Sequence, residues 1–438
     1  MVDTISDRSE RRFDIDWLRV ILFGLLIPFH VAIGVYWSTY GEGINPNITD
    51  DPDERLAIAD EGNDYTAESI DPASMILHWM HQWRLAALFM ISGMGTAFAF
   101  KRRKWSTFLI ERLQRLLVPM IFGMWTIGFA SNILTGAIEL EGDTFADVLI
   151  EFLFHVIFTS FVFWVPLFGK LIALHHLWFL WNLFLYSLLC VPIFHYIQQH
   201  PEGGFAQKLR GMFSLKGGLG VFLVLPVLLA LTEVVFKPWF PGFMGIGYEW
   251  VWYLVFFIFG YICIISREHY YQFIEVNRIK ISATTAVLTV LFVLLRIQQH
   301  NDGVPYMDGG WLEVGILHDE MTILACFLHS FHAWFWCLTV FSWGAHLLNK
   351  PSPYLVYLNQ GVYPFYIIHL PIVFAGLKLA KEFEVTNIAA VLFGSIFVTI
   401  GCWLAFEMVR RTRITRYLFG IKSIKQDASI VPQDISKL

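Results

Sequence analysis

Charged side chains are scarce in this chain. They make up 15% of its 438 residues, while 56% of the residues are hydrophobic. A soluble globular domain carries about 25% charged residues. No polar stretch is long enough to fold as a soluble domain by itself. The composition therefore excludes an ordinary soluble protein, and a net charge of −5 gives no reason to expect a nucleic-acid partner.

Cysteine pairs and internal repeats are also missing. The five cysteines lie in apolar segments without a CxxC spacing, as small buried side chains do, so no metal centre is predicted. The absence of an evident repeat weighs against a transporter, because many transporter folds are built from inverted repeats. A polytopic transporter of a small polar solute is nevertheless the alternative function, since buried charges and many helices also suit alternating access.

Long apolar runs dominate the chain instead. They predict an all-α integral membrane protein with about ten transmembrane helices. Residues 1–425 are treated as a single membrane domain and residues 426–438 as a cytoplasmic tail. The predicted spans lie near residues 18–37, 75–100, 116–138, 175–197, 218–236, 250–266, 281–298, 321–346, 362–380 and 388–409.

The loops between these spans alternate in charge. The N-terminus, the stretch 101–115 and the C-terminal tail are basic, whereas the loop 39–72 is acidic. Basic residues mark the cytoplasmic side of a membrane protein. We therefore predict that both termini are cytoplasmic and that the protein lies in the cell (inner or plasma) membrane.

The segment 148–168 complicates this topology. It is apolar and long enough to cross the bilayer, but it contains Glu151, His155 and Pro166. If it crossed, every later basic loop would move to the outer side, against the charge rule. We therefore predict that it is a re-entrant or interfacial segment on the outer side.

Two ionisable residues, Arg19 and His30, lie inside the first apolar segment. Insertion of such a side chain into a membrane helix costs about 2.5–3.5 kcal/mol, so a function is the first hypothesis for it. In one continuous helix, their spacing places His30 within roughly 20° of the face that carries Arg19, about 16 Å further along the axis. Pro28 is expected to kink that helix. The pattern predicts a fixed positive charge near one membrane surface and a titratable base deeper in.

Four sequence blocks, in order and spread over essentially the whole chain, resemble membrane-bound acyltransferase family 3. Arg19 and His30 reproduce the R-x10-H pattern of its first helix. The H-L-W-F-L variant of the third block is similar to the glucan succinyltransferase-like branch of that family. The other blocks are Leu88-Phe-Met-Ile-Ser92-Gly93 with the basic stretch 101–119, His176-Leu-Trp-Phe-Leu180, and Tyr363-Pro-Phe-Tyr366-Ile-Ile-His369.

The resemblance implies an acyltransferase. It would move a short acyl group, acetyl or succinyl, from cytoplasmic acyl-CoA to a hydroxyl of an extracytoplasmic glycan or other sugar-containing acceptor. No bound cofactor is expected, because acyl-CoA is a co-substrate. The other expected partners are the sugar acceptor and the lipid bilayer, and the oligomeric state stays open.

His30 is the predicted catalytic base, because imidazole titrates near neutral pH and can remove a hydroxyl proton. A hydrogen-bonded core histidine is the alternative. Arg19 is predicted to act in catalysis by holding the donor, with an ion pair to Asp16 as the alternative. Asp319 and Glu320 are the candidate carboxylates for orienting the base.

Other polar residues complete the predicted site. A basic cytoplasmic mouth would attract the phosphates of CoA, although positive-inside anchoring is the favoured explanation of residues 101–104. The predicted acyl-CoA-binding residues are Arg19, Arg102, Arg103, Arg112 and Arg115. The predicted acceptor-side residues are Arg84, His176, Trp178, Tyr366 and His369. A haem held by facing pairs such as His78/His81 and His329/His332 is the remaining alternative.

Overall fold

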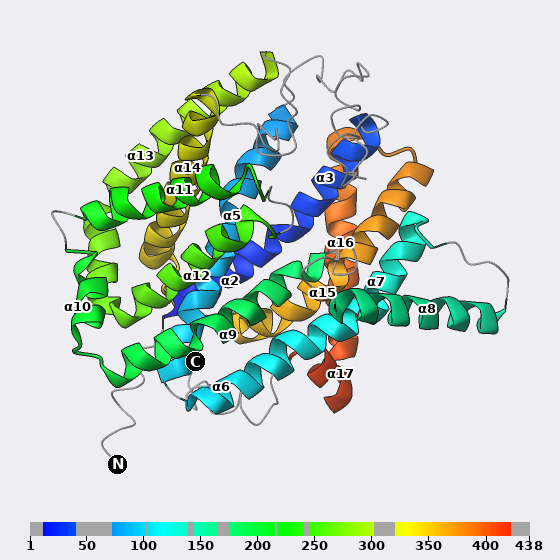
Figure 1. The fold of residues 1–438 in the computed structure, drawn as a ribbon. Coiled ribbons are helices and arrows are strands. Elements are labelled where there is room, and N and C mark those ends of the chain that lie inside the picture. Colours follow the sequence, from blue (N-terminus) through cyan, green and yellow to red (C-terminus); the bar gives the residue numbers. More distant parts are fainter. Residues whose placement is uncertain are drawn as a thin grey trace. The chain divides into compact units, whose positions relative to one another are not determined.

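The computed structural model describes residues 12–40, 72–101, 103–138, 144–164, 176–214, 218–240, 245–301 and 320–421. Within these ranges the chain forms helices and no strands (Figure 1). The predicted fold class is confirmed: the chain is an all-α integral membrane protein. The helices are α2 (Phe13–Gly24), α3 (Leu26–Tyr40), α5 (Pro72–Lys101), α6 (Trp105–Arg112), η2 (Leu113–Leu117), α7 (Val118–Thr135), α8 (Phe145–Trp164), α9 (Trp178–Gln199), α10 (Gly204–Gly211), η5 (Gly220–Val224), α11 (Leu225–Phe236), α12 (Tyr248–Ile265), α13 (Arg267–Asn301), α14 (Glu320–Leu347), α15 (Pro353–Glu382), α16 (Asn387–Val409) and α17 (Arg413–Leu418).

Nine helical stretches in the described part of the chain are long and apolar enough to cross a membrane, and the first of them, Phe13–Val35, is formed by α2 and α3 together. They correspond to nine of the ten predicted spans. The remaining span, predicted near 218–236, is the shorter apolar helix Gly220–Phe236, formed by η5 and α11 together. The apolar runs of the sequence therefore coincide with helices of suitable length for membrane spans.

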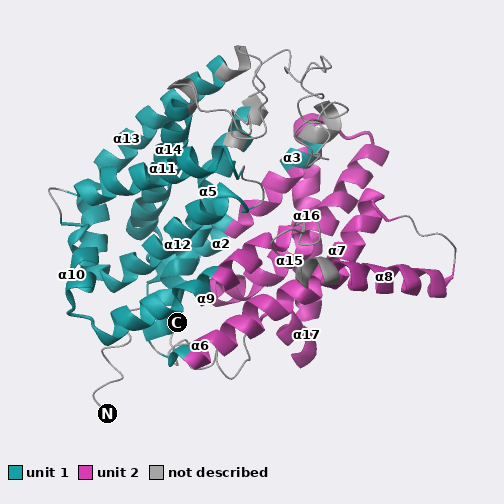
Figure 2. Ribbon diagram, in the orientation of Figure 1, with its two compact units in different colours: residues 1–22, 32–105, 186–352 teal, residues 23–31, 106–185, 353–438 magenta. Residues whose placement is uncertain are grey.

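The chain forms two compact units (Figure 2). Unit 1 comprises residues 1–22, 32–105 and 186–352, and unit 2 comprises residues 23–31, 106–185 and 353–438. Each unit is assembled from segments that are distant in the sequence. The boundary passes between Arg19, in unit 1, and His30, in unit 2.

Close backbone contact between α5 and α12 holds the centre of unit 1. A Cβ atom added to Gly93 would lie 1.9 Å from the carbonyl oxygen of Phe257, and one added to Gly260 would lie 2.0 Å from that of Met90. No larger residue fits at either position. Small residues let membrane helices approach in this way.

In unit 2, α15 packs against both α7 and α16. Gly123 of α7 provides the space on one side, because an added Cβ would lie 3.0 Å from Leu177 and 3.1 Å from Ile367. Two prolines, Pro364 and Pro371, lie inside α15. This helix carries the last of the sequence blocks into the interior of unit 2.

The first apolar segment is two helices, and this corrects the alignment expected for Arg19 and His30. The helix is interrupted at Leu25, between α2 and α3. Pro28 explains the break, since it has no N–H to donate to the Gly24 carbonyl and its ring crowds that carbonyl. An angle calculated for one straight helix therefore does not relate the two side chains.

The segment predicted at 148–168 begins as the helix α8, and residues 165–168 lie outside the described part. Thr144 and Asp147 cap its start through reciprocal hydrogen bonds. The bonds from Thr144 lower the pKa of the Asp147 carboxyl.

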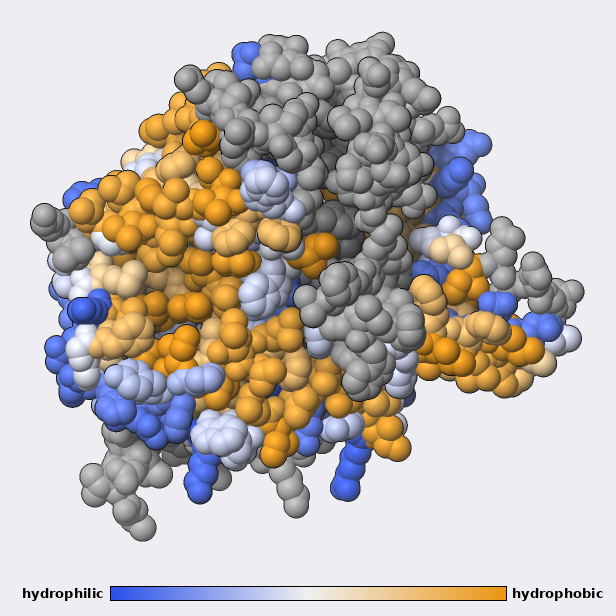
Figure 3. All heavy atoms as spheres, viewed as in Figure 1, coloured by the Kyte–Doolittle hydropathy of each residue, from blue (hydrophilic) through white to orange (hydrophobic). Residues whose placement is uncertain are grey.

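The polar side of α8 faces α7. His155 Nε2 bonds to the carbonyl oxygen of Met124 at 3.0 Å, and Trp125 donates to Ser160 at 3.2 Å. The other side carries exposed apolar side chains such as Phe154, 68% exposed, and contributes to the hydrophobic surface in Figure 3. Such a helix suits an apolar environment. The re-entrant or interfacial placement stays a prediction.

Candidate active site

Three histidine rings meet inside unit 2. The ring centroids of His30 and His369 are 4.9 Å apart, and those of His176 and His369 are 4.8 Å apart. His369 is fully buried, His176 and Tyr366 are buried, and His30 is partly exposed. Four of the residues predicted separately as the base or as acceptor-side groups therefore lie in one cluster, which we call the histidine cluster: His30, His176, Tyr366 and His369.

Backbone carbonyls orient all three rings. His30 Nδ1 lies 2.9 Å from the Leu26 carbonyl oxygen, and His369 Nδ1 lies 2.7 Å from that of Tyr366. His176 bonds through Nε2 to the Ile367 carbonyl oxygen at 3.0 Å. A carbonyl oxygen only accepts, so the bonded nitrogen of each ring carries the proton.

This assignment fixes which nitrogen of each neutral ring can act as a base. In His30 and His369 the lone pair is on Nε2, and in His176 it is on Nδ1. A neutral imidazole whose other nitrogen is held by a hydrogen bond has the tautomer and ring orientation of a general base. The histidine cluster can therefore take up a proton from a hydroxyl group.

Helix periodicity places Tyr366 and His369, the two cluster residues of α15, on one face of that helix. Tyr363, Tyr366 and His369 follow one another at three-residue intervals, so their side chains are neighbours along the helix. The Tyr366 hydroxyl donates to the His176 carbonyl oxygen. Phe179 packs edge-on against Tyr366, with ring centroids 5.8 Å apart. Phe179 thus forms an aromatic wall beside the cluster.

Trp178, predicted on the acceptor side, lies beside the cluster rather than in it. It is the first residue of α9, two positions after His176. Its ring is 6.4 Å from that of Phe179 and is 8% exposed. A buried ring has little free face on which a sugar could stack, so this tryptophan supports Phe179 and the cluster wall.

Two predicted donor-binding arginines lie in the same unit. The Arg112 guanidinium lies over the Phe108 ring at 4.7 Å, and that of Arg115 lies 5.9 Å from the Tyr363 ring centroid. Arg115 lies in the π-helical turn η2 and Arg112 directly precedes it, and such turns are often found at functional sites. Because Tyr363 and His369 share α15, six residues apart, about 9 Å of helix rise separates this arginine contact from the histidine cluster.

Arg19 lies in unit 1, where it makes the ion pair considered as its alternative role. Its guanidinium is 3.9 Å from the Asp16 carboxylate, and its side chain is 30% exposed. The guanidinium also lies against α5, because a Cβ added to Gly95 would be 3.3 Å from its Nη2 atom. The glycine provides the space that the arginine occupies.

The other predicted site residues are more scattered. Arg84 is fully buried in α5 of unit 1, and Arg103 is half-buried between α5 and α6. Arg102 and Asp319 lie outside the described residues. Glu320 begins α14, and the structure describes its backbone only.

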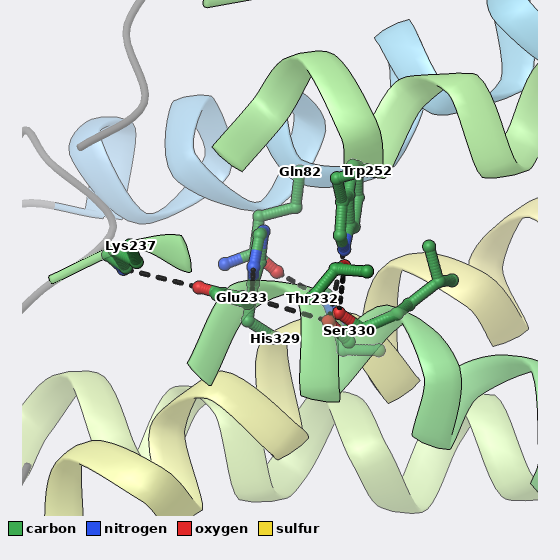
Figure 4. Close-up of polar contacts among 9 residues, drawn as sticks. Gln82, Thr232, Glu233, Lys237, Trp252, His329 and Ser330 are labelled. Atoms are coloured by element: carbon green, nitrogen blue, oxygen red, sulfur yellow. Dashed lines mark hydrogen bonds and ion pairs between the residues drawn. The ribbon is translucent and has the colours of Figure 1, made fainter. Parts of the chain in front are cut away.

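One polar cluster was not predicted from the sequence. Glu233 of α11 is buried in unit 1, 3.2 Å from Lys237 and 2.8 Å from His329 (Figure 4). The signal was a single carboxylate inside the apolar stretch 218–236. Its partner could not be foreseen, because 96 residues separate Glu233 from His329.

Neither cluster offers a metal centre. Within the described ranges, no group of three or more His, Cys, Asp or Glu side chains could hold a metal ion. The three rings of the histidine cluster are each bound to a backbone carbonyl instead.

Comparison with known proteins agrees with the predicted resemblance. The model of a family described as an acyltransferase domain matches residues 12–407. The chain is also similar to glucans biosynthesis protein C of Escherichia coli O139:H28 (strain E24377A / ETEC), with 22% identity over 424 residues, which covers 95% of this chain and 96% of that protein. The protein of that name from Escherichia coli K12 is similar to the same extent, 22% over 424 residues. No solved structure matches the chain.

The family match includes every residue of the histidine cluster, together with Arg112 and Arg115. The apolar helices establish a multi-pass membrane protein. The chain therefore belongs to the acyltransferase domain family and is a membrane acyltransferase for groups other than amino-acyl groups.

Proposed function

We propose that this protein moves a short acyl group, acetyl or succinyl, from cytoplasmic acyl-CoA to a hydroxyl of an extracytoplasmic glycan. The family supports the reaction class, and the name of its relatives, glucans biosynthesis protein C, supports a glycan acceptor. The observation that carries the proposal is the contact of His30 with His369, since O-acylation needs a base inside the membrane domain.

His30 is the proposed base. Its Nδ1–H donates to the Leu26 carbonyl oxygen, so Nε2 can accept the proton of the acceptor hydroxyl. The hydroxyl oxygen then bonds to the thioester carbonyl carbon, and the carbon–sulfur bond breaks. The proton passes from His30 to the leaving thiolate, which gives the ester and free CoA. His176, Tyr366 and His369 would position the acceptor oxygen against this nitrogen.

The arginines supply the proposed binding energy for the donor. CoA carries several phosphate groups, and guanidinium groups bind phosphate through paired hydrogen bonds. Arg112 and Arg115 are the strongest candidates, because α15 connects the Arg115 contact to the histidine cluster. Arg19, Arg102 and Arg103 remain further candidates on the cytoplasmic side.

Placement in the cell membrane with both termini in the cytoplasm is part of the proposal. The basic stretches support it, because they fall on one side when the ten apolar runs cross the bilayer. In this arrangement the donor enters from the cytoplasm and the acceptor from the opposite side. Acyl-CoA is consumed in each turnover, so the scheme has no resident cofactor.

The experiment compares surface glycans from cells that contain the protein with those from cells that lack it. Mass spectrometry should find an acetyl or succinyl mass on a glycan only in the first sample. Membranes from those cells, given acyl-CoA and the deacylated glycan, should release CoA in proportion to the ester formed. Identical glycans in both samples, together with no acceptor-dependent CoA release, would reject the proposal.

A further inference from the structure

Unit 1 contains a buried charge network that the proposed chemistry does not use. The Glu233 carboxylate accepts from Lys237 at 3.2 Å, from His329 at 2.8 Å and from Ser330 at 3.2 Å. Glu233 is 1% exposed, and Lys237 is 4% exposed. Ionisable groups buried in a membrane helix are expensive and usually serve a function. Figure 4 shows these side chains converging on Glu233.

The network fixes the tautomer of His329. Lys237 donates to Glu233 at 3.2 Å, and a carboxylate that pairs with an ammonium group accepts hydrogen bonds. The proton between Glu233 and His329 is therefore on Nδ1, and in the neutral imidazole the lone pair is on Nε2. A carboxylate that anchors one imidazole nitrogen in this way orients the other for a ligand.

Aromatic stacking fixes the ring plane. His329 lies parallel to the Trp252 indole, with ring centroids 5.2 Å apart and an interplanar angle of 7°. The Trp252 Nε1–H donates to Ser330 at 3.1 Å, and Ser330 in turn donates to Glu233. The ring that stacks on His329 and the carboxylate that holds its Nδ1 are thus joined in one network.

His329 is the member of this network that reaches the surface. Its side chain is 19% exposed, whereas Glu233, Trp252 and Ser330 are each at most 2% exposed. Among the residues that the structure describes, no side chain or backbone group donates to its Nε2. The structure thus presents an oriented hydrogen-bond acceptor at an accessible edge.

The position of the network favours the glycan acceptor over acyl-CoA as its ligand. Glu233 lies near the end of α11, and His329 lies in the third turn of α14. From the charge pattern of the loops, we expect both of these helix ends to face away from the cytoplasm.

We infer that Nε2 of His329 accepts a hydrogen bond from a hydroxyl of the glycan acceptor, with Glu233 as the positioning residue. The inference rests on the proposed function and adds a recognition site in unit 1. A lone pair backed by a carboxylate selects a hydroxyl donor rather than a phosphate or carboxylate group. No bond is made or broken at this site.

Two substitutions of His329 isolate the Nε2 atom. His329→Asn keeps an N–H toward Glu233 but has no acceptor where Nε2 stood, whereas the longer His329→Gln places its carbonyl oxygen near that position. We expect His329→Asn to raise the KM for the glycan about tenfold, with kcat and the KM for acyl-CoA unchanged. His329→Gln should recover most of the loss. His332→Asn is the matched control, because His332 lies one turn further along α14 and bonds to Gln82 of α5 instead.

The role of Glu233 has its own test. Glu233→Gln can donate its amide N–H to Nδ1, which moves the imidazole proton to Nε2 and removes the acceptor. It should raise the KM for the glycan without changing the KM for acyl-CoA, a split that general loosening of the bundle would not produce. Melting temperatures in detergent show whether each variant folds.

A measurement on the wild-type protein covers the case in which the variants do not fold. Diethyl pyrocarbonate modifies an accessible imidazole lone pair, and peptide mass mapping reads each histidine separately. Saturating glycan should protect His329 several-fold, and acyl-CoA should not.

The outcomes separate the two claims. A wild-type protein that acylates no glycan contradicts the proposed function itself. Normal acylation with an unchanged glycan KM in His329→Asn, or a fall in kcat alone, overturns only the recognition site. Equal modification of His329 with and without glycan overturns it as well.

Discussion

The His30 and His369 rings lie 4.9 Å apart at an interplanar angle of 66°, although 339 positions separate them in a 438-residue chain. The Nδ1 atoms of both rings donate to carbonyl oxygens of their own helices. In both neutral rings the lone pair is therefore on Nε2. This contact joins the first and last of the sequence blocks and defines the site on which the predictions depend.

Replacement of His369 should damage turnover. His369→Asn keeps an amide N–H for the Tyr366 carbonyl but removes the ring that contacts both His30 and His176. We expect kcat to fall about 10- to 100-fold, within the usual range for a group that assists proton transfer. The measurement is CoA release in membranes with saturating glycan. His155→Gln, which changes a buried histidine bonded to α7, serves as the control and should stay near wild-type activity.

The arginine beside Tyr363 should affect donor binding. Arg115→Lys keeps the charge but loses the planar guanidinium over the Tyr363 ring. The KM for acyl-CoA should rise about tenfold, which corresponds to about 1.4 kcal/mol, while the KM for the glycan stays the same. Arg410→Lys provides a comparison, since Arg410 lies 5.2 Å from the Tyr357 ring outside the site. Equal effects of the two substitutions would argue against a donor role for Arg115.

Gly93 should be essential to the packing of unit 1. In Gly93→Ala the new methyl group would lie 1.9 Å from the Phe257 carbonyl oxygen, so α5 and α12 must separate. Overpacking of this kind costs about 1–3 kcal/mol. The melting temperature in detergent should fall clearly, and Gly204→Ala, where an added Cβ meets nothing within 4 Å, should leave it unchanged. A stable Gly93→Ala protein would mean that the two helices are not packed this closely.

The helices and several site residues could be predicted from the sequence. Long apolar runs identify membrane spans because the bilayer requires them, and the sequence blocks marked His30, His176, Tyr366 and His369 individually. Their convergence could not be derived, since it depends on how α15 packs in unit 2. The family resemblance identified these residues, and the tertiary structure shows that they lie together.

Other features depended on contacts that a sequence does not display. Pro28 explains the break at Leu25, but only the structure shows that the helix is interrupted at this point between Arg19 and His30. Glu233 is a single acid among apolar residues in the sequence, but its proposed role depends on contacts with Lys237 and His329 that only the structure shows. A carboxylate for orienting the base was expected at 319–320, whereas in the described part of unit 1 the buried carboxylate that bonds to a histidine is Glu233.

The most direct test of the account is the rate of acyl transfer by His30→Asn. This variant keeps an amide N–H for the Leu26 carbonyl and removes the Nε2 lone pair, so the helix should fold as before. Ester formation on the glycan, followed by mass spectrometry with saturating acyl-CoA, should fall by about 10²- to 10⁴-fold at an unchanged melting temperature. Transfer within a factor of about three of the wild-type rate would contradict the assignment of His30 as the base.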